Sequence, residues 1–86
     1  MVSYKILIKS TAVKELKRLP IKDCQRITSK IQFLSTEPRP LGCEKLSAQE
    51  RYRIRQGNYR IVYSIEDDKL IVYGVKIAHR RDVYKS

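Results

Sequence analysis

The sequence predicts an α+β fold in which an N-terminal strand and a two-helix hairpin precede an antiparallel meander of three strands. Apolar residues recur at helical spacings of three and four up to residue 36, and the spacing changes to two from Arg51 onward. Short turn sequences then divide the rest of the chain into strands. Because short strands cannot bury an apolar face alone, we expect the strands to form one small sheet that the helices cover on one face.

The first elements expected are a strand and a short helix. Residues 2–9 alternate loosely between apolar and polar side chains, which is typical of a half-buried strand. Ser10 or Thr11 can cap the helix that follows, and this helix extends to about Leu19. Pro20 ends that helix or occupies the first turn of the next one.

A second, amphipathic helix is expected over residues 21–36, followed by a loop at residues 38–42. The apolar residues on one face of this helix are Ile21, Cys24, Ile27, Ile31 and Leu34. Cys24 is therefore expected to act as a small buried hydrophobe. With Cys43 as the second cysteine and a single histidine in the chain, we expect neither a disulfide nor a metal site.

The second half of the chain is expected to form the meander. Its first strand begins at Arg51, and residues 57–58, Gly-Asn, form a tight hairpin turn. The second strand covers residues 59–65 and the third covers residues 70–77. The two aspartates at positions 67 and 68 supply the turn between them.

Length and charge restrict the class of protein. The 86 residues are expected to form one domain, residues 1–86, with a thin core. Lysine and arginine number 19 against 9 acids, and the net charge of +10 creates a field that attracts polyanions. No secretory signal and no membrane-spanning segment is recognisable, so we expect a cytoplasmic protein without a membrane partner.

Arginines gather on the sheet face that the helices are expected to leave open. The period of two places Arg53 and Arg55 together, and the hairpin brings Arg60 beside them. No acid occurs between residues 51 and 63, so nothing within this segment relieves the repulsion between like charges. Arginine forks hold two phosphate oxygens at once, which favours polyanion binding over a merely solvated charged surface.

The C-terminal segment adds side chains that can bind phosphate or move a proton. Lys76 lies near the end of the last strand, and His79, Arg80, Arg81 and Tyr84 follow. Nearby cations would lower the pKa of Tyr84 from its ordinary value of about 10, and Tyr84 could then act as a general base. The alternative is that Tyr84 is an exposed aromatic residue or one that packs against the fold, without a catalytic role. His79 could shuttle protons, or could hydrogen-bond and stack at the strand end.

Three segments together resemble the RelE/ParE superfamily of bacterial and archaeal toxins. They are Tyr52-Arg53-Ile54-Arg55, Gly57-Asn58-Tyr59-Arg60-Ile61-Val62-Tyr63 and His79-Arg80-Arg81-Asp82-Val83-Tyr84. The expected first strand, the two helices and the segment at Lys45-Leu46 also fit the pattern of this superfamily, so the resemblance covers essentially the whole chain. It implies a compact α+β fold and a cognate antitoxin, whose acidic segment we expect to cover the basic face.

The resemblance implies one of two activities. Members of the RelE-like branch cleave mRNA in the ribosomal A site without metal or cofactor, whereas members of the ParE-like branch inhibit DNA gyrase. The tyrosine and arginines of the C-terminal segment favour the first activity, because a pure binder has no need of a positioned base. We therefore expect a ribosome-dependent endoribonuclease with the ribosome and mRNA as partners. A nucleic-acid-binding module without activity is the third interpretation.

The site residues implied by the resemblance have distinct roles in attack by the substrate's own 2′-hydroxyl. Tyr84 is the base, Arg60 contacts the scissile phosphate, and Arg80 or Arg81 stabilises the phosphorane or the leaving group. The residues expected to bind and orient RNA are Arg53, Arg55, Lys45, Lys76 and His79. Among these, Arg53 and Arg55 would also lower the pKa of Tyr84.

Two positions depart from the pattern of the superfamily. Relatives often carry lysine in the first basic strand, but Arg53 and Arg55 do not lose a proton, so the role of base falls to Tyr84. Relatives also commonly carry glycine where Ala78 stands. If that position requires a positive φ, Ala78 destabilises the strand end or redirects the segment that follows.

Overall fold

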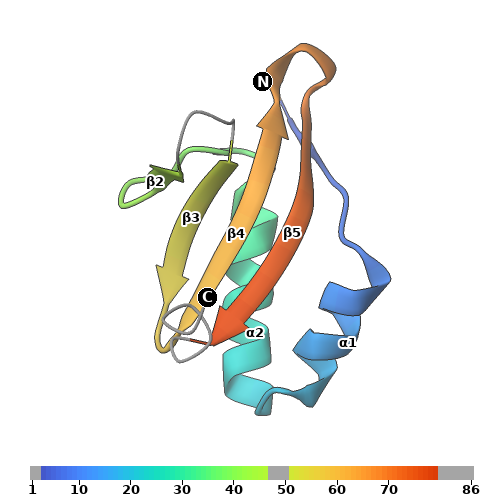
Figure 1. The fold of residues 1–86 in the computed structure, drawn as a ribbon, viewed down its shortest axis with the longest axis vertical. Helices are drawn as coiled ribbons and strands as arrows, with labels where there is room; N and C mark the ends of the chain where they lie inside the picture. Colours follow the sequence, from blue (N-terminus) through green and yellow to red (C-terminus); the bar gives the residue numbers. More distant parts are fainter. Residues whose placement is uncertain (1–2, 47–50, 80–86) are drawn as a thin grey trace.

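The computed structural model describes residues 3–46 and 51–79, in which two helices cover one face of a five-stranded sheet (Figure 1). The helix α2 lies behind the central strands, and α1 lies along the β5 side. In chain order the elements are β1 (Lys5–Ile6), α1 (Ser10–Arg18), α2 (Ile21–Phe33), β2 (Glu44–Leu46), β3 (Arg51–Gln56), β4 (Tyr59–Glu66), a 3₁₀ turn (Asp67–Lys69) and β5 (Ile71–His79). The predicted α+β class, with two helices before a three-stranded meander, is confirmed.

The sheet has the strand order β1-β5-β4-β3-β2. The strands from β2 to β5 pair antiparallel with one another in chain order, and β1 joins the outer edge of β5 in parallel. Within the described part of the chain β1 has two residues rather than the eight expected, because pairing with β5 ends where the chain turns into α1. The strand β2 was not expected, because its sequence Glu-Lys-Leu carries no strand pattern of its own.

The core lies between the helices and the inner face of the sheet. The helices contribute Leu16, Ile27 and Ile31, and Leu34 directly after α2 joins them. The sheet contributes Tyr52, Ile54, Ile61, Tyr63, Ile65, Val72, Val75 and Ile77. Cys24 packs against this core as expected and is only partly buried, and both cysteines are free thiols. Both helices of the described part of the chain therefore pack on one face of the sheet.

A bulge in β5 sets which side chains reach the face opposite the two helices. Ser64 pairs with Tyr73 and Val62 with Lys76, so β5 contains one more residue than β4 between the two pairs. Gly74 absorbs this residue with a φ of 64°, a left-handed conformation that favours glycine. Leu70 is the one non-glycine residue with positive φ in the described ranges, so Ala78 occupies ordinary strand backbone and is not strained.

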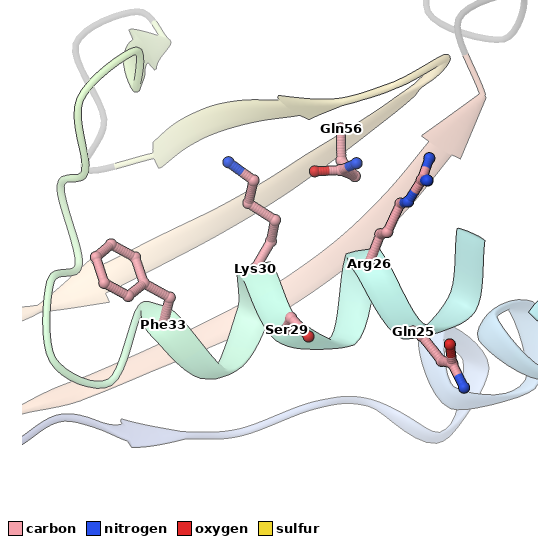
Figure 2. Close-up of a pocket in the computed structure, with 6 residues that line it drawn as sticks. All are labelled: Gln25, Arg26, Ser29, Lys30, Phe33 and Gln56. Atoms are coloured by element: carbon pink, nitrogen blue, oxygen red, sulfur yellow. The ribbon is translucent and has the colours of Figure 1, made fainter. Parts of the chain in front are cut away.

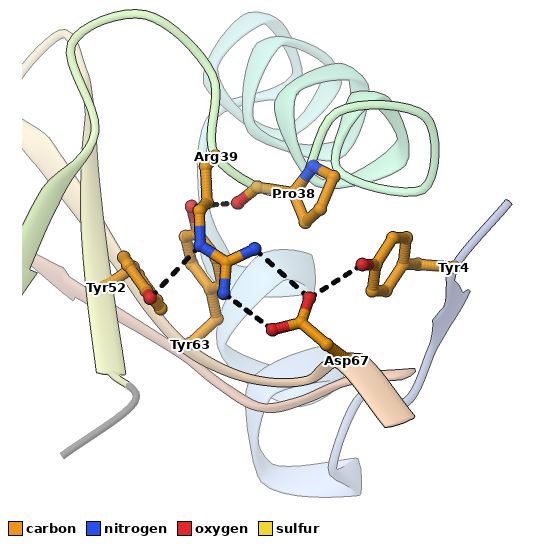
Figure 3. Close-up of polar contacts among 6 residues, drawn as sticks. All are labelled: Tyr4, Pro38, Arg39, Tyr52, Tyr63 and Asp67. Atoms are coloured by element: carbon orange, nitrogen blue, oxygen red, sulfur yellow. Dashed lines mark hydrogen bonds and ion pairs between the residues drawn. The ribbon is translucent and has the colours of Figure 1, made fainter. Parts of the chain in front are cut away.

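A polar cluster joins the loop after α2 to the end of the sheet where β4 turns into β5 (Figure 3). Both terminal nitrogens of Arg39 donate to the carboxylate of Asp67, at 3.1 and 2.8 Å, and Nε donates to the hydroxyl of Tyr52 at 3.1 Å. The hydroxyl of Tyr4 donates to the same carboxylate at 2.7 Å, and Tyr63 donates to the carbonyl oxygen of Pro38 at 2.7 Å.

These contacts hold the loop that leads into β2. The guanidinium of Arg39 also lies over the ring of Tyr52, 5.0 Å from its centroid. The loop is thus tied to β3 and to the turn after β4, and the chain enters β2 at a defined position on the edge of β3. The sequence contained no periodic signal for this cluster, because its members are far apart along the chain.

The Arg39–Asp67 ion pair predicts a pH-dependent stability. The hydrogen bonds from Arg39, followed by that from Tyr4, lower the pKa of Asp67 to about 2, whereas an unfolded aspartate titrates near pH 3.9. A lowered folded pKa stabilises the protein above the unfolded pKa, and the contribution is lost as the pH falls toward 2. Asp67→Asn should therefore lower the melting temperature by a few degrees at pH 7.

Thermal unfolding followed by circular dichroism between pH 2 and pH 7 measures this effect. The melting temperatures of the wild type and Asp67→Asn should converge as the pH falls from about 4 to about 2. A difference that stays constant over this range would show that the negative charge of Asp67 does not stabilise the fold.

Candidate nucleic-acid interface

The side of the sheet opposite the two helices, here called the outer face, carries Arg51, Arg53, Arg55, Arg60 and Lys76. Residues that pair directly across antiparallel strands project from the same face with Cβ atoms about 5 Å apart. One cross-strand row consists of Arg55, Arg60 and Ala78, on β3, β4 and β5. The expectation that the hairpin brings Arg60 beside Arg55 is therefore confirmed.

The next row along the strands consists of Glu44, Arg53, Val62 and Lys76, from β2 to β5. Val62 separates the cations of Arg53 and Lys76, which lie two strands apart. Since strands are spaced about 4.8 Å apart, the two Cα atoms are roughly 10 Å from each other. The two rows together form a broad cationic surface rather than a single point of charge.

Arg60 differs from the other cations of the outer face because only 5% of its surface is exposed. It is the buried charged residue among those described. Its direct cross-strand neighbours are Arg55 on β3 and Ala78 on β5. A buried cation is poorly screened by water and salt. The sequence did not indicate this burial.

Glu44 places one carboxylate among these cations, so the expectation of a face without acids is wrong. Arg53 donates a hydrogen bond to Glu44, and an Arg55 nitrogen lies 3.7 Å from the other carboxylate oxygen. The Arg53 hydrogen bond lowers the pKa of Glu44 below its ordinary value. Residues 51–63 do lack acids, but the carboxylate comes from β2, whose pairing with β3 the sequence did not reveal.

The structure does not bring Lys45 and His79 to the outer face. Lys45 pairs with Tyr52 and His79 pairs with Tyr59, and both tyrosines belong to the side that faces the helices. The rings of Tyr59 and His79 meet edge to face with centroids 5.3 Å apart, which matches the stacking alternative for His79. The remaining site residues of the sequence analysis, Arg80, Arg81 and Tyr84, lie outside the described residues.

A separate groove of about 530 Å³ runs along the exposed side of α2 (Figure 2). Arg26, Lys30 and Phe33 project into it from α2, and Gln56 reaches it from the end of β3. The side chains described as lining it supply cations, amides, one hydroxyl and one aromatic ring, with no carboxylate, thiol, imidazole or phenol. A proton-transferring site is therefore better sought on the outer face.

Among residues 3–46 and 51–79, no group of three or more histidine, cysteine, aspartate or glutamate side chains could hold a metal ion. Neither described helix is long and apolar enough to cross a membrane.

Comparison with known proteins gives a consistent set of relatives. Residues 6–84 match the family described as the ParE toxin of the type II toxin–antitoxin system parDE. The chain is 30% identical to the toxin RelE1 of Methanocaldococcus jannaschii over 87 residues, with 96% of this chain and 97% of the relative covered. It is 28% identical to the toxin RelG of Mycobacterium tuberculosis, with 95% and 97% covered.

The fold has a close counterpart among solved structures. The archaeal RelE–RelB complex from Pyrococcus horikoshii OT3 contains a chain that matches with a TM-score of 0.78 and 26% identity. The match covers 91% of this chain and 96% of that chain. The arrangement of helices and sheet described above is therefore shared with a toxin that has been solved together with its partner.

The position of Glu44 predicts how the outer face responds to polyanions. Glu44→Gln removes the carboxylate that competes for Arg53 and Arg55, so affinity for a polyanion should rise several-fold at low salt. The salt concentration at which the protein elutes from heparin measures this change. Asp68→Asn makes the same charge change in the turn at the far end of the sheet and serves as the control. Equal elution of the two variants would contradict the assignment.

Proposed function

Because this chain belongs to the RelE/ParE superfamily of type II toxin–antitoxin toxins, we propose that it is a ribosome-dependent endoribonuclease that cleaves mRNA in the A site. Two relatives that carry the names RelE1 and RelG support the RelE-like branch. The activity would place the protein in the cytoplasm, where it acts as a single domain on the ribosome.

The row of Arg55 and Arg60 on the outer face carries this proposal. Two arginines in direct cross-strand register repel each other and contribute nothing to the apolar core. Such an arrangement is useful where a phosphate lies between or above the two guanidinium groups. The side chain of Arg55 is 59% exposed and can make first contact, while Arg60 contributes a poorly screened charge from within the sheet.

The proposed reaction needs no nucleophile from the protein. Tyr84, as a phenolate, accepts the proton of the 2′-hydroxyl, and the 2′-oxygen forms a bond to the adjacent phosphorus. The bond from phosphorus to the 5′-oxygen then breaks, which leaves a 2′,3′-cyclic phosphate, and the leaving 5′-oxygen takes a proton from solvent to become a 5′-hydroxyl. Arg60 holds the scissile phosphate, and Arg80 or Arg81 stabilises the charge that develops on the phosphorane or the leaving oxygen.

The end of β5 supports this assignment of the C-terminal residues. Ala78 pairs with Arg60, and Arg80 follows two positions later in the sequence. The segment that carries Arg80, Arg81 and Tyr84 therefore starts from the end of the sheet where Arg55 and Arg60 lie.

An antitoxin is the second proposed partner. The matching chain from Pyrococcus horikoshii was solved as a RelE–RelB complex, which supports a partner of the same kind here. Glu44 already pairs with Arg53 and Arg55, and it illustrates how carboxylates of an acidic partner segment would bind the outer face. Such a segment would neutralise the cations that RNA needs.

Inhibition of DNA gyrase is the alternative function. The observation that favours it is the description of the matching family, which names the ParE toxin. A gyrase inhibitor would use the outer face for binding alone and would have no need of Tyr84. Cleavage and gyrase inhibition are therefore separable by experiment.

Toeprinting of mRNA on ribosomes with the purified protein tests the proposal. The wild type should produce a cut within the A-site codon, and Tyr84→Phe should reduce the cleavage rate by about 10²-fold or more, because it lacks the base. Tyr73→Phe is a matched control, since Tyr73 is an exposed tyrosine on β5 to which we assign no role.

The outcomes separate the two functions. Cleavage by Tyr84→Phe at the wild-type rate would show that Tyr84 is not the general base. If the wild type instead inhibits DNA supercoiling by gyrase and makes no cut in ribosome-bound mRNA, the protein is a gyrase inhibitor and not a nuclease.

A further inference from the structure

A hollow of about 210 Å³ lies between α1 and the bulged part of β5. It is formed by the start of α1 together with residues of β3 and β5. The residues that matter for its chemistry are Lys9, Glu15, Arg51, Gly74 and Lys76. None of the roles assigned above to the outer face uses Lys9, Glu15 or Arg51.

The backbone of β5 explains why a hollow exists at this point. Gly74 has no side chain, and a Cβ atom built there would meet only the Ser64 hydroxyl at 3.8 Å, which is ordinary contact. On the other side α1 packs with Ala12, a small residue that is 3% exposed. Gly74 and Ala12 both line the hollow, and the absence of long side chains at these two positions leaves room for a compact ligand.

Cations from three separate elements line this hollow. Lys9 immediately precedes α1, Arg51 begins β3, and Lys76 lies in the second half of β5. Glu15 is the one acid in the lining, so the charges of the lining sum to about +2 with ordinary protonation. Cations that converge from separate elements on a hollow repel one another, and an anion would relieve that repulsion.

The hollow continues the cationic rows of the outer face. Along β3, Arg55, Arg53 and Arg51 follow one another at every second residue, a spacing of about 7 Å. Lys76 belongs both to the row of Arg53 and to the lining of the hollow. The cations therefore form a path from Arg55 and Arg60 across the sheet to α1.

We propose that this hollow binds a phosphate of the RNA backbone at a distance from the cleaved bond. The inference rests on the proposed function, because the path begins at the arginines assigned to the scissile phosphate. A regularly charged polymer suits a regular path of cations, and a phosphate needs several donors around a compact anion. The site positions the RNA and takes no part in the chemical step.

Binding of a single-stranded 2′-O-methyl oligoribonucleotide, which cannot be cleaved by 2′-hydroxyl attack, tests the proposal. Lys9→Gln should weaken binding several-fold and reduce the slope of log K against log salt by about 0.7, the value for one lost phosphate contact on a single strand. Lys14→Gln removes the same charge from the same helix outside the hollow and is the matched control. Glu15→Gln should strengthen binding, because it removes the competing carboxylate.

Ribosome assays separate failure of this site from failure of the proposed function. If the wild type cleaves, Lys9→Gln should raise KM and leave kcat unchanged, and Lys9→Arg should restore both binding and KM. Equal salt slopes for Lys9→Gln and Lys14→Gln would overturn the site even if the wild type cleaves. If the salt slope falls only in Lys9→Gln and the wild type does not cleave mRNA, the phosphate site is supported and the nuclease function is rejected.

Discussion

The concentration of positive charge on one side of a thin sheet is the constraint on which the rest of the structure depends. Arg55 and Arg60 lie in direct register, with Arg53 and Lys76 in the next row. Like charges at this spacing oppose the pairing of the strands that carry them. The pairing must therefore be stabilised from the other side, where the inner face of the same strands packs against Ile27 and Ile31 of α2 and against Leu34 directly after it.

Local features of the chain adapt this layout to its charge. The ties from Arg39 to Asp67 and Tyr52 position the loop before β2, and β2 delivers Glu44 to Arg53 and Arg55. The bulge at Gly74 brings Lys76 into the row of Arg53 and keeps Val75 in the core. The edge strand thus moderates the repulsion, and the bulge extends the cationic surface. The arrangement of charges on the outer face therefore depends on the Arg39 contacts and on the bulge at Gly74.

Much of the fold follows from local pattern, and the rest depends on distant contacts. Apolar spacing located both helices, and a period of two with a Gly57-Asn58 turn was enough to place Arg60 beside Arg55. The strand β2 escaped prediction because its three residues pair only where the Arg39 cluster holds the loop. Lys45 and His79 were grouped with the arginines by type, although each pairs with an inner-face tyrosine. A shift of one residue along a strand moves a side chain to the opposite face of the sheet, and residue type alone does not reveal which face a side chain occupies.

In the function proposed here, the RNA backbone binds the outer face rather than the groove along α2. Side-chain NMR of 15N-labelled arginines during titration with an uncleavable single-stranded RNA tests it most directly. The Nε–H signals of Arg53, Arg55 and Arg60 should shift together, and the signal of Arg26 in the α2 groove should stay in place. Shifts at Arg26 with unchanged signals from the outer face would contradict the account.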